Sequence, residues 1–222
     1  EGTVGATGDL MGVDATYQLD SKTRLRGEVA TTDRDISNVP SSGSAWMGEV
    51  TRHEEKWDAN IYVRNQTDSF GMGQQAASET GTRKIGADGR YKLSDSKQLQ
   101  AHAYLQESTT SAAQNSVAEV RVNNQINESL SAYYGARVSR DQNASVDTHS
   151  NQLLGGTDYT MPDKKLILHA AAEVSVGKAG SAEMPDRLIL GAEYKVTEQT
   201  RLFAEQEFAR GEQISANTSR AG

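Results

Sequence analysis

The sequence predicts an all-β protein, an antiparallel up-and-down sheet of about 12 strands. Two observations predict this fold. Apolar and polar residues alternate at period two through most of the chain, which is typical of strands. In addition, one phrase recurs, as YQLDSKTRL at 17–25, YKLSDSKQL at 91–99 and YKVTEQTRL at 194–202. A helical fold fits poorly, because the apolar residues do not recur at positions i, i+3 and i+4.

The recurring phrase predicts a strand end, a tight turn and the start of the next strand. Such turns are expected near 20–23, 53–56, 94–97, 127–129, 162–164 and 197–200. Longer segments rich in Ser, Thr, Asn, Gln, Asp and Gly are typical of loops and are expected at 32–44, 65–83, 107–115, 139–150 and 175–186. We therefore expect six successive hairpins over residues 1–222, as one β-barrel domain or barrel segment, with a polar loop-like tail at 211–222.

The expected strands follow one another between these connections. The first places Val13, Ala15 and Tyr17 on one face and Asp14 and Thr16 on the other. Most of the others alternate equally well, whereas three are less regular: 45–53 mixes its two faces, and 151–161 and 165–174 carry apolar residues on both. In chain order the strands are expected at 13–19, 24–29, 45–53, 57–64, 84–93, 98–105, 118–123, 130–138, 151–161, 165–174, 188–196 and 201–208.

Composition excludes several classes of protein. The net charge is −7 and no basic cluster is present, which argues against a nucleic-acid partner. The chain has no cysteine, so disulfides, thiolate catalysis and cysteine-based metal sites are excluded. A transmembrane helix is not expected either, because no run of about 18 apolar residues occurs.

The number of strands helps to decide whether the apolar face of the sheet points into the barrel or outward to lipid. An open sheet would leave two unpaired edges that invite aggregation, so we expect the sheet to close or to form a sandwich. In a barrel, about eight strands already enclose enough space for side chains to fill. Twelve strands lined with Ala, Val, Leu and Gly would leave voids. The small apolar residues are therefore expected to face lipid, and the charged face to line a wet interior.

With these features, and with strand–turn–strand units such as LGAEYKVTEQTRLFAEQE at 190–207, the sequence resembles bacterial outer-membrane β-barrels. The resemblance implies an antiparallel up-and-down transmembrane β-barrel with short periplasmic turns and longer outer loops. It also implies a location in the bacterial outer membrane, with the lipid bilayer as partner. Aromatic residues beside the short turns would anchor the barrel at the lipid interface: Tyr17, Trp57, Tyr91, Tyr159 and Tyr194.

Two features depart from this resemblance. Such barrels usually end on a strand with a terminal aromatic residue, whereas this sequence ends SANTSRAG. The second rim also lacks a clear aromatic girdle. Two interpretations therefore stay open. The chain is a complete barrel, or it shares a barrel with further strands or other envelope proteins.

Charged residues of both signs occupy the polar face of the expected strands. Rings of such charges set solute selectivity in pores, whereas cross-strand pairs of the same residues would simply hold the sheet in register. The residues expected to line the lumen are Arg24, Arg26, Glu28, Asp58, Arg64, Asp88, Arg90, Glu119, Arg121, Arg137, Glu193, Glu205 and Glu207.

No motif in the sequence predicts catalysis, and we expect neither an enzyme nor a cofactor. The stretch HEEKW at 53–57 lacks the second histidine of a zinc protease. The four histidines His53, His102, His149 and His169 are scattered over different strands and loops, so no metal site is expected.

Three functions remain open from the sequence. The first is an outer-membrane barrel that forms a water-filled passage, or a membrane frame, for transport of solutes or macromolecules. The second is a plugged structural anchor in a larger envelope assembly. The third is a soluble antiparallel β-sandwich or adhesin segment, which the low apolar content of 36% favours.

Overall fold

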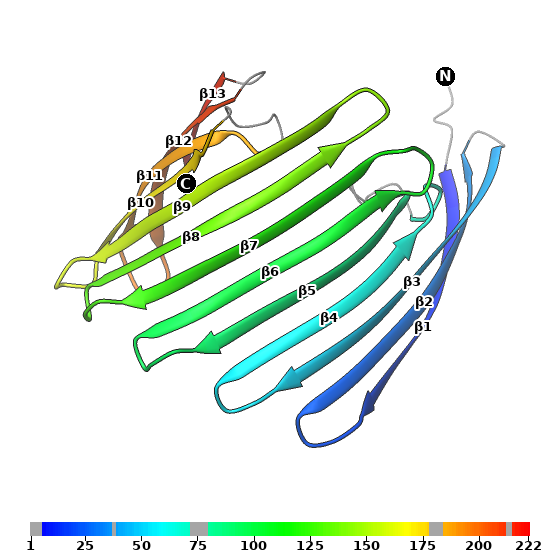
Figure 1. Cartoon of the computed structure of the whole chain (residues 1–222), viewed down its shortest axis with the longest axis horizontal. Coiled ribbons are helices and arrows are strands. Elements are labelled where there is room, and N and C mark those ends of the chain that lie inside the picture. The colour runs from blue at the N-terminus through cyan, green and yellow to red at the C-terminus, as the bar shows by residue number, and fades with distance from the viewer. Residues whose placement is uncertain (1–5, 37–38, 72–79, 178–183, 212–214) are drawn as a thin grey trace. The chain divides into compact units, whose positions relative to one another are not determined.

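The computed structural model describes residues 6–36, 39–71, 80–177, 184–211 and 215–222. All regular elements in these ranges are antiparallel strands, and consecutive strands lie side by side in the order β1 to β13 (Figure 1). The strands are β1 (Ala6–Gln18), β2 (Thr23–Ile36), β3 (Val39–His53), β4 (Trp57–Gln66), β5 (Thr82–Lys92), β6 (Lys97–Ser108), β7 (Gln114–Gln125), β8 (Leu130–Gln142), β9 (Asp147–Thr160), β10 (Leu166–Ser175), β11 (Asp186–Lys195), β12 (Arg201–Arg210) and β13 (Ser215–Ala221).

The predicted all-β meander is confirmed, with one strand more than expected. The additional strand, β13, lies inside the segment 211–222 that was expected to be a loop-like tail. It pairs with β12 from Ser215↔Arg210 to Ala221↔Ala204. Its side chains are mostly polar on both faces, so it has no period-two signature; backbone pairing with β12 and the ion pairs of Arg220 define it. No part of the described chain is a helix long and apolar enough to cross a membrane.

The six predicted tight turns are confirmed. In five of them a polar side chain accepts backbone N–H groups, as in Asx turns, whereas the turn at 53–56 has a backbone hydrogen bond from Glu54 to Trp57. Asp20 Oδ1 accepts from the N–H groups of Lys22 and Thr23 at 2.7 Å. Asn127 Oδ1 does the same for Ser129 and Leu130 at 2.9 Å.

The connections at the other ends of the hairpins are shorter than predicted. β2 and β3 stay paired as far as Ile36↔Val39, so most of the expected loop 32–44 is strand. β8 and β9 likewise occupy most of 139–150. These segments look like loops in sequence because Ser, Thr and Asp predominate, yet their backbones complete the ladder. Longer connections remain between β4 and β5 and between β10 and β11.

The chain divides into two compact units, which we describe separately. Unit 1 comprises Glu1–Gly89, Ala103–Ser116 and Gln142–Val146; unit 2 comprises Arg90–His102, Val117–Asp141 and Asp147–Gly222. Closure of the sheet into a barrel, by pairing of its first and last strands, stays a prediction.

In unit 1 the strand register separates an apolar face from a polar face. Residues that pair across neighbouring strands share a face. Val13 pairs with Val29, and Val50 pairs with both Leu25 and Ile61, so these side chains form the apolar face. Alternate residues form the polar face, with Asp14 opposite Glu28 and Arg26 opposite Glu49. The irregular segment 45–53 obeys the same rule, because Trp46 pairs with Val29 and Met47 with Glu28.

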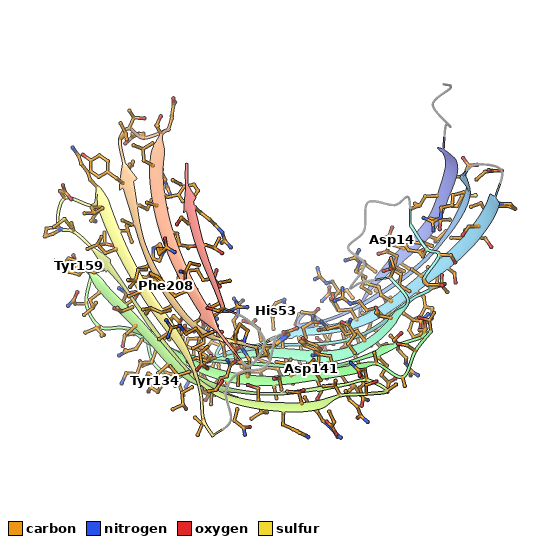
Figure 2. All side chains as sticks on the ribbon, turned by 90° about the horizontal axis from the view of Figure 1, so that it is seen from above. Asp14, His53, Tyr134, Asp141, Tyr159 and Phe208 are labelled. Atoms are coloured by element: carbon orange, nitrogen blue, oxygen red, sulfur yellow. The ribbon has the colours of Figure 1, made fainter. Side chains whose placement is uncertain are left out.

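Unit 2 has the same two faces. On the apolar face Tyr194 pairs with Leu166 and Leu202, and Tyr159 pairs with Leu168. On the polar face Glu173 pairs with Arg187. The irregular segments 151–161 and 165–174 are explained by apolar residues that lie on this polar face, such as Leu154, which pairs with Glu173. Figure 2 shows Tyr134 and Tyr159 on the side of the unit 2 strands opposite to Asp141.

Burial is the reverse of what a water-soluble protein shows. Large apolar side chains are exposed on the apolar faces, for example Val13 at 71%, Ile61 at 57% and Leu190 at 45%. The largest fully buried residues are instead Gln152, Thr32 and Pro185. Val117, Leu154 and Ala209 are also buried, and the last two pair with charged residues of the polar face.

Candidate functional site: the polar face

The charged residues expected to line a lumen all lie on the polar faces, by strand register or by alternation along their strand. Their role as lumen lining stays a prediction. Unit 1 carries Arg24, Arg26, Glu28, Asp58, Arg64 and Asp88, and unit 2 carries Arg90, Glu119, Arg121, Arg137, Glu193, Glu205 and Glu207.

Arg137 is the centre of a charged network on β7 to β10 of unit 2. Its Nε donates to Glu119 at 2.8 Å, and its two terminal nitrogens donate to Glu173 at 3.1 and 3.3 Å. It also donates to Gln152 Oε1 at 3.3 Å. The three charged side chains are only 17–18% exposed. Because an unpaired charge is costly at such burial, this network holds four strands in register.

Gln152 fastens the end of the β10–β11 connection to the polar face. The residue is 2% exposed, and its amide nitrogen donates to the carbonyl oxygens of Met184 and Pro185, each at 3.0 Å. Pro185 is itself fully buried. The backbone at 184–185 therefore lies on the polar face of unit 2 rather than beyond the strand ends.

A similar contact occurs on the polar face of unit 1. Thr32, which is 1% exposed, accepts a hydrogen bond from the N–H of Gly71 at 3.0 Å. Gly43 lies so close to the backbone of Phe70 that a Cβ there would be 2.3 Å from its nitrogen. The start of the β4–β5 connection thus folds onto the polar face as well. Sequence patterns did not identify Gln152 or Thr32, since an uncharged polar residue in a polar segment carries no distinguishing signal.

Three of the remaining predicted residues, Glu193, Glu205 and Glu207, form cross-strand ion pairs with arginine. Arg220 contacts Glu205 at 3.1 Å and Glu207 at 3.7 Å, and Arg201 contacts Glu193 at 3.0 Å. Arg26 pairs with Glu28 along β2 at 3.1 Å. Glu205 and Glu207 are thus held by arginine, which does not favour a catalytic carboxylate pair.

Histidines do not gather into a site in the described part of the chain. His53, His149 and His169 each lie beside one carboxylate, those of Asp58, Asp147 and Glu205. Across the described ranges, no three His, Asp or Glu side chains are placed to hold a metal ion.

The five aromatic residues expected at a lipid interface lie on the apolar faces, next to tight turns. Tyr17 and Trp57 belong to unit 1, and Tyr91, Tyr159 and Tyr194 to unit 2. The four tyrosines are 39–63% exposed. Arg52 adds a cation on this rim, with its Cζ 6.0 Å from the centroid of the Trp57 ring. Such belts of Tyr and Trp are typical of membrane–water boundaries, although their position in a membrane stays a prediction.

Neither a family model nor a curated protein sequence matches the chain. Solved structures do match. A bacterial polysaccharide outer membrane secretin is similar with a TM-score of 0.53 and 11% identity, over 95% of this chain and 87% of that one. A triple mutant of the Rhodopseudomonas blastica porin is similar with a TM-score of 0.50 and 9% identity, over 97% of this chain and 89% of the porin. The KdgM porin in complex with disordered oligogalacturonate has a TM-score of 0.46 and 13% identity, over 81% of this chain and 90% of that one. The chain therefore has the fold of outer-membrane porin-like β-barrel proteins.

Proposed function

We propose that the chain forms the wall, or part of the wall, of a water-filled passage for solutes through the bacterial outer membrane. The single observation that carries this proposal is the inverted burial of its two faces. Large exposed apolar surfaces mark contact with a membrane or a protein, and exposed large apolar side chains lie on β1 to β5 and on β7 to β12. The polar faces supply the hydrated lining that an outer-membrane passage needs.

The length of the strands agrees with this function. A transmembrane strand needs about 9–11 residues, and the shortest strands from β1 to β12 have 10. Tyrosines beside the tight turns then mark one membrane boundary.

A plugged structural anchor is the second candidate. One observation favours it, namely that the backbones near Gly71 and Pro185 occupy part of the polar faces. Backbone lying on the lining narrows a passage, and additional protein there would close it.

The direct test is conductance of the refolded chain in planar lipid bilayers. The chain has no cysteine, so single cysteines report on each face. Discrete current steps are expected, and a charged thiol reagent is expected to reduce the current of Arg64→Cys but not of Val63→Cys. The two residues are neighbours on β4, with Arg64 on the polar face and Val63 on the apolar face.

Other outcomes separate the alternatives. A folded chain that inserts into bilayers without current steps would favour the plugged anchor. A chain that stays folded in water without detergent, and does not insert, would contradict both membrane functions.

A further inference from the structure

Arg64 and Arg121 differ in what they contact from the ion-paired arginines of the polar faces. Arg26, Arg137, Arg187, Arg201 and Arg220 all lie within ion-pair distance of a glutamate. Within the described ranges, neither Arg64 nor Arg121 forms an ion pair, and each lies instead over a tyrosine ring. No carboxylate of the described residues therefore lies within ion-pair distance of either guanidinium.

Arg121 is held in place by uncharged partners. One terminal nitrogen donates to Gln100 Oε1 at 2.9 Å, and the Cζ lies 5.2 Å from the centroid of the Tyr133 ring. That ring covers Gly156 on β9, where a Cβ would be 2.4 Å from the ring atom Cε1. Glycine is therefore required for the ring to lie flat against the neighbouring strand, which fixes the platform beneath Arg121.

Unit 1 repeats this arrangement with different residues. The Cζ of Arg64 lies 5.7 Å from the centroid of the Tyr62 ring. Tyr62 in turn covers Gly86 on β5, where a Cβ would be 2.4 Å from the phenolic oxygen. The combination of arginine, tyrosine and cross-strand glycine thus occurs once in each unit, always on the polar face.

A fixed guanidinium that keeps its charge is suited to oxyanions. Its planar fork of N–H donors matches a carboxylate or a phosphate in geometry. Because a tyrosine ring holds each side chain, and for Arg121 also the amide oxygen of Gln100, less conformational freedom remains to be lost when an anion binds.

We propose that Arg121 on its Tyr133 platform, and Arg64 on Tyr62, are contact sites for solutes that carry a carboxylate or phosphate group. This inference rests on the proposed passage, since it names the class of solute that the lining retains. Arg64 and Arg121, each over a tyrosine ring, bind the oxyanion, whereas the ion-paired arginines stabilise the sheet.

Binding to the folded chain in detergent micelles tests the proposal without requiring conductance. Glucuronate and glucose 6-phosphate are titrated by calorimetry, with glucose as the neutral control. We expect both anions to bind and glucose not to bind. Binding of only one anion would still support the proposal and would identify the preferred oxyanion.

Matched variants assign the binding to these residues. Arg121→Gln should weaken anion binding about tenfold, as expected for loss of a charge-assisted contact, and Arg64→Gln should weaken it similarly at a second site. Arg26→Gln removes the same charge from an ion-paired arginine, and less than about a twofold change is expected. Strand circular dichroism and the Tm of each variant report whether it is folded.

The proposal is overturned if glucose binds with the same affinity as the anions, or if no anion binds to the wild-type chain. It is also overturned if the Arg26→Gln and Arg121→Gln variants lose the same amount of anion affinity. Bilayer conductance, measured on the same preparations, keeps the two proposals separate. Current steps without anion binding would contradict only this inference, and anion binding without current steps would contradict only the passage.

Discussion

Neighbouring residues of β11 lie in two different environments. Leu188 and Leu190, on the apolar face, are 43% and 45% exposed. On the polar face, Arg187 and Glu193 lie within 3.6 Å of charged partners on β12. In a water-soluble protein the leucines would be covered and the charges solvated. Stability on the polar face therefore comes from pairs within the protein, whereas stability on the apolar face depends on the solvent outside it.

The largest effect is expected from placing a charge on the apolar face. Leu190→Arg in lipid bilayers should lower the free energy of unfolding by about 2–4 kcal/mol, the cost of a cation in hydrocarbon. Ile189→Arg is the matched control, because Ile189 pairs with Glu207 on the polar face, and less than about 1 kcal/mol is expected. Urea titration of both variants measures the difference. Equal stability of the two variants would mean that Leu190 faces water.

A smaller loss is expected when the polar network loses its centre. Arg137→Gln leaves the carboxylates of Glu119 and Glu173, which both contact the guanidinium, without a cation. The free energy of unfolding should fall by about 2 kcal/mol. Arg140→Gln serves as control. Its pair with Asp147 is more than 40% exposed at both side chains, so the loss should be below about 0.5 kcal/mol. If both variants lose a similar free energy of unfolding, the Arg137 network stabilises the protein no more than an exposed ion pair does.

Breaking the contact of Gln152 should be milder still. Gln152→Leu leaves the carbonyl oxygens of Met184 and Pro185 without their donor, at a cost of about 1–2 kcal/mol. If the backbone at 184–185 narrows a passage, the single-channel current should also increase. Asn151→Leu is the control, because Asn151 directly precedes Gln152 and lies on the exposed apolar face, and this change should leave the current unaltered. An unaltered current in Gln152→Leu would separate this contact from permeation.

The smallest effect is expected at the tight turns, which belong to neither face. Hydrogen bonds from Lys22 and then Arg52 lower the pKa of Glu54. The stabilisation from Glu54 is therefore complete above the carboxyl's ordinary pKa of about 4.3, and it is lost as the pH falls through the lowered pKa of the folded state. Glu54→Gln should flatten the decrease of Tm below pH 5. An unchanged dependence of Tm on pH would mean that Glu54 does not form its hydrogen bonds with Lys22 and Arg52 when the protein is in solution.

Period-two alternation predicted the fold wherever one face is apolar and the other polar. The pairs Val13↔Val29 and Asp14↔Glu28 follow directly from that pattern. Prediction failed where both faces are polar, as in β13 and in the extension of β2 and β3 to Ile36↔Val39. There backbone hydrogen bonds and contacts between polar side chains define the strand, and the hydropathy pattern does not reveal either of them.

The polar face was predictable as a set of charges but not as a network. Alternation placed Arg121 and Arg137 on one face, yet it did not show that Arg137 contacts two glutamates while Arg121 lies over Tyr133. Contacts between strands depend on register, and a single sequence does not fix register between strands that are far apart in the chain. The contacts of Thr32 and Gln152 depend on where distant connections fold, which local patterns do not encode.

The most direct test of the central claim is the environment of consecutive residues along β11. Nitroxide labels on single cysteines at 187–194, in reconstituted membranes, report collisions with oxygen in lipid and with a water-soluble nickel complex. We predict that oxygen accessibility peaks at Leu188, Leu190, Ala192 and Tyr194, and that nickel accessibility peaks at the residues between them. Nickel accessibility that is equally high at every position would contradict the assignment of lipid to one face and water to the other.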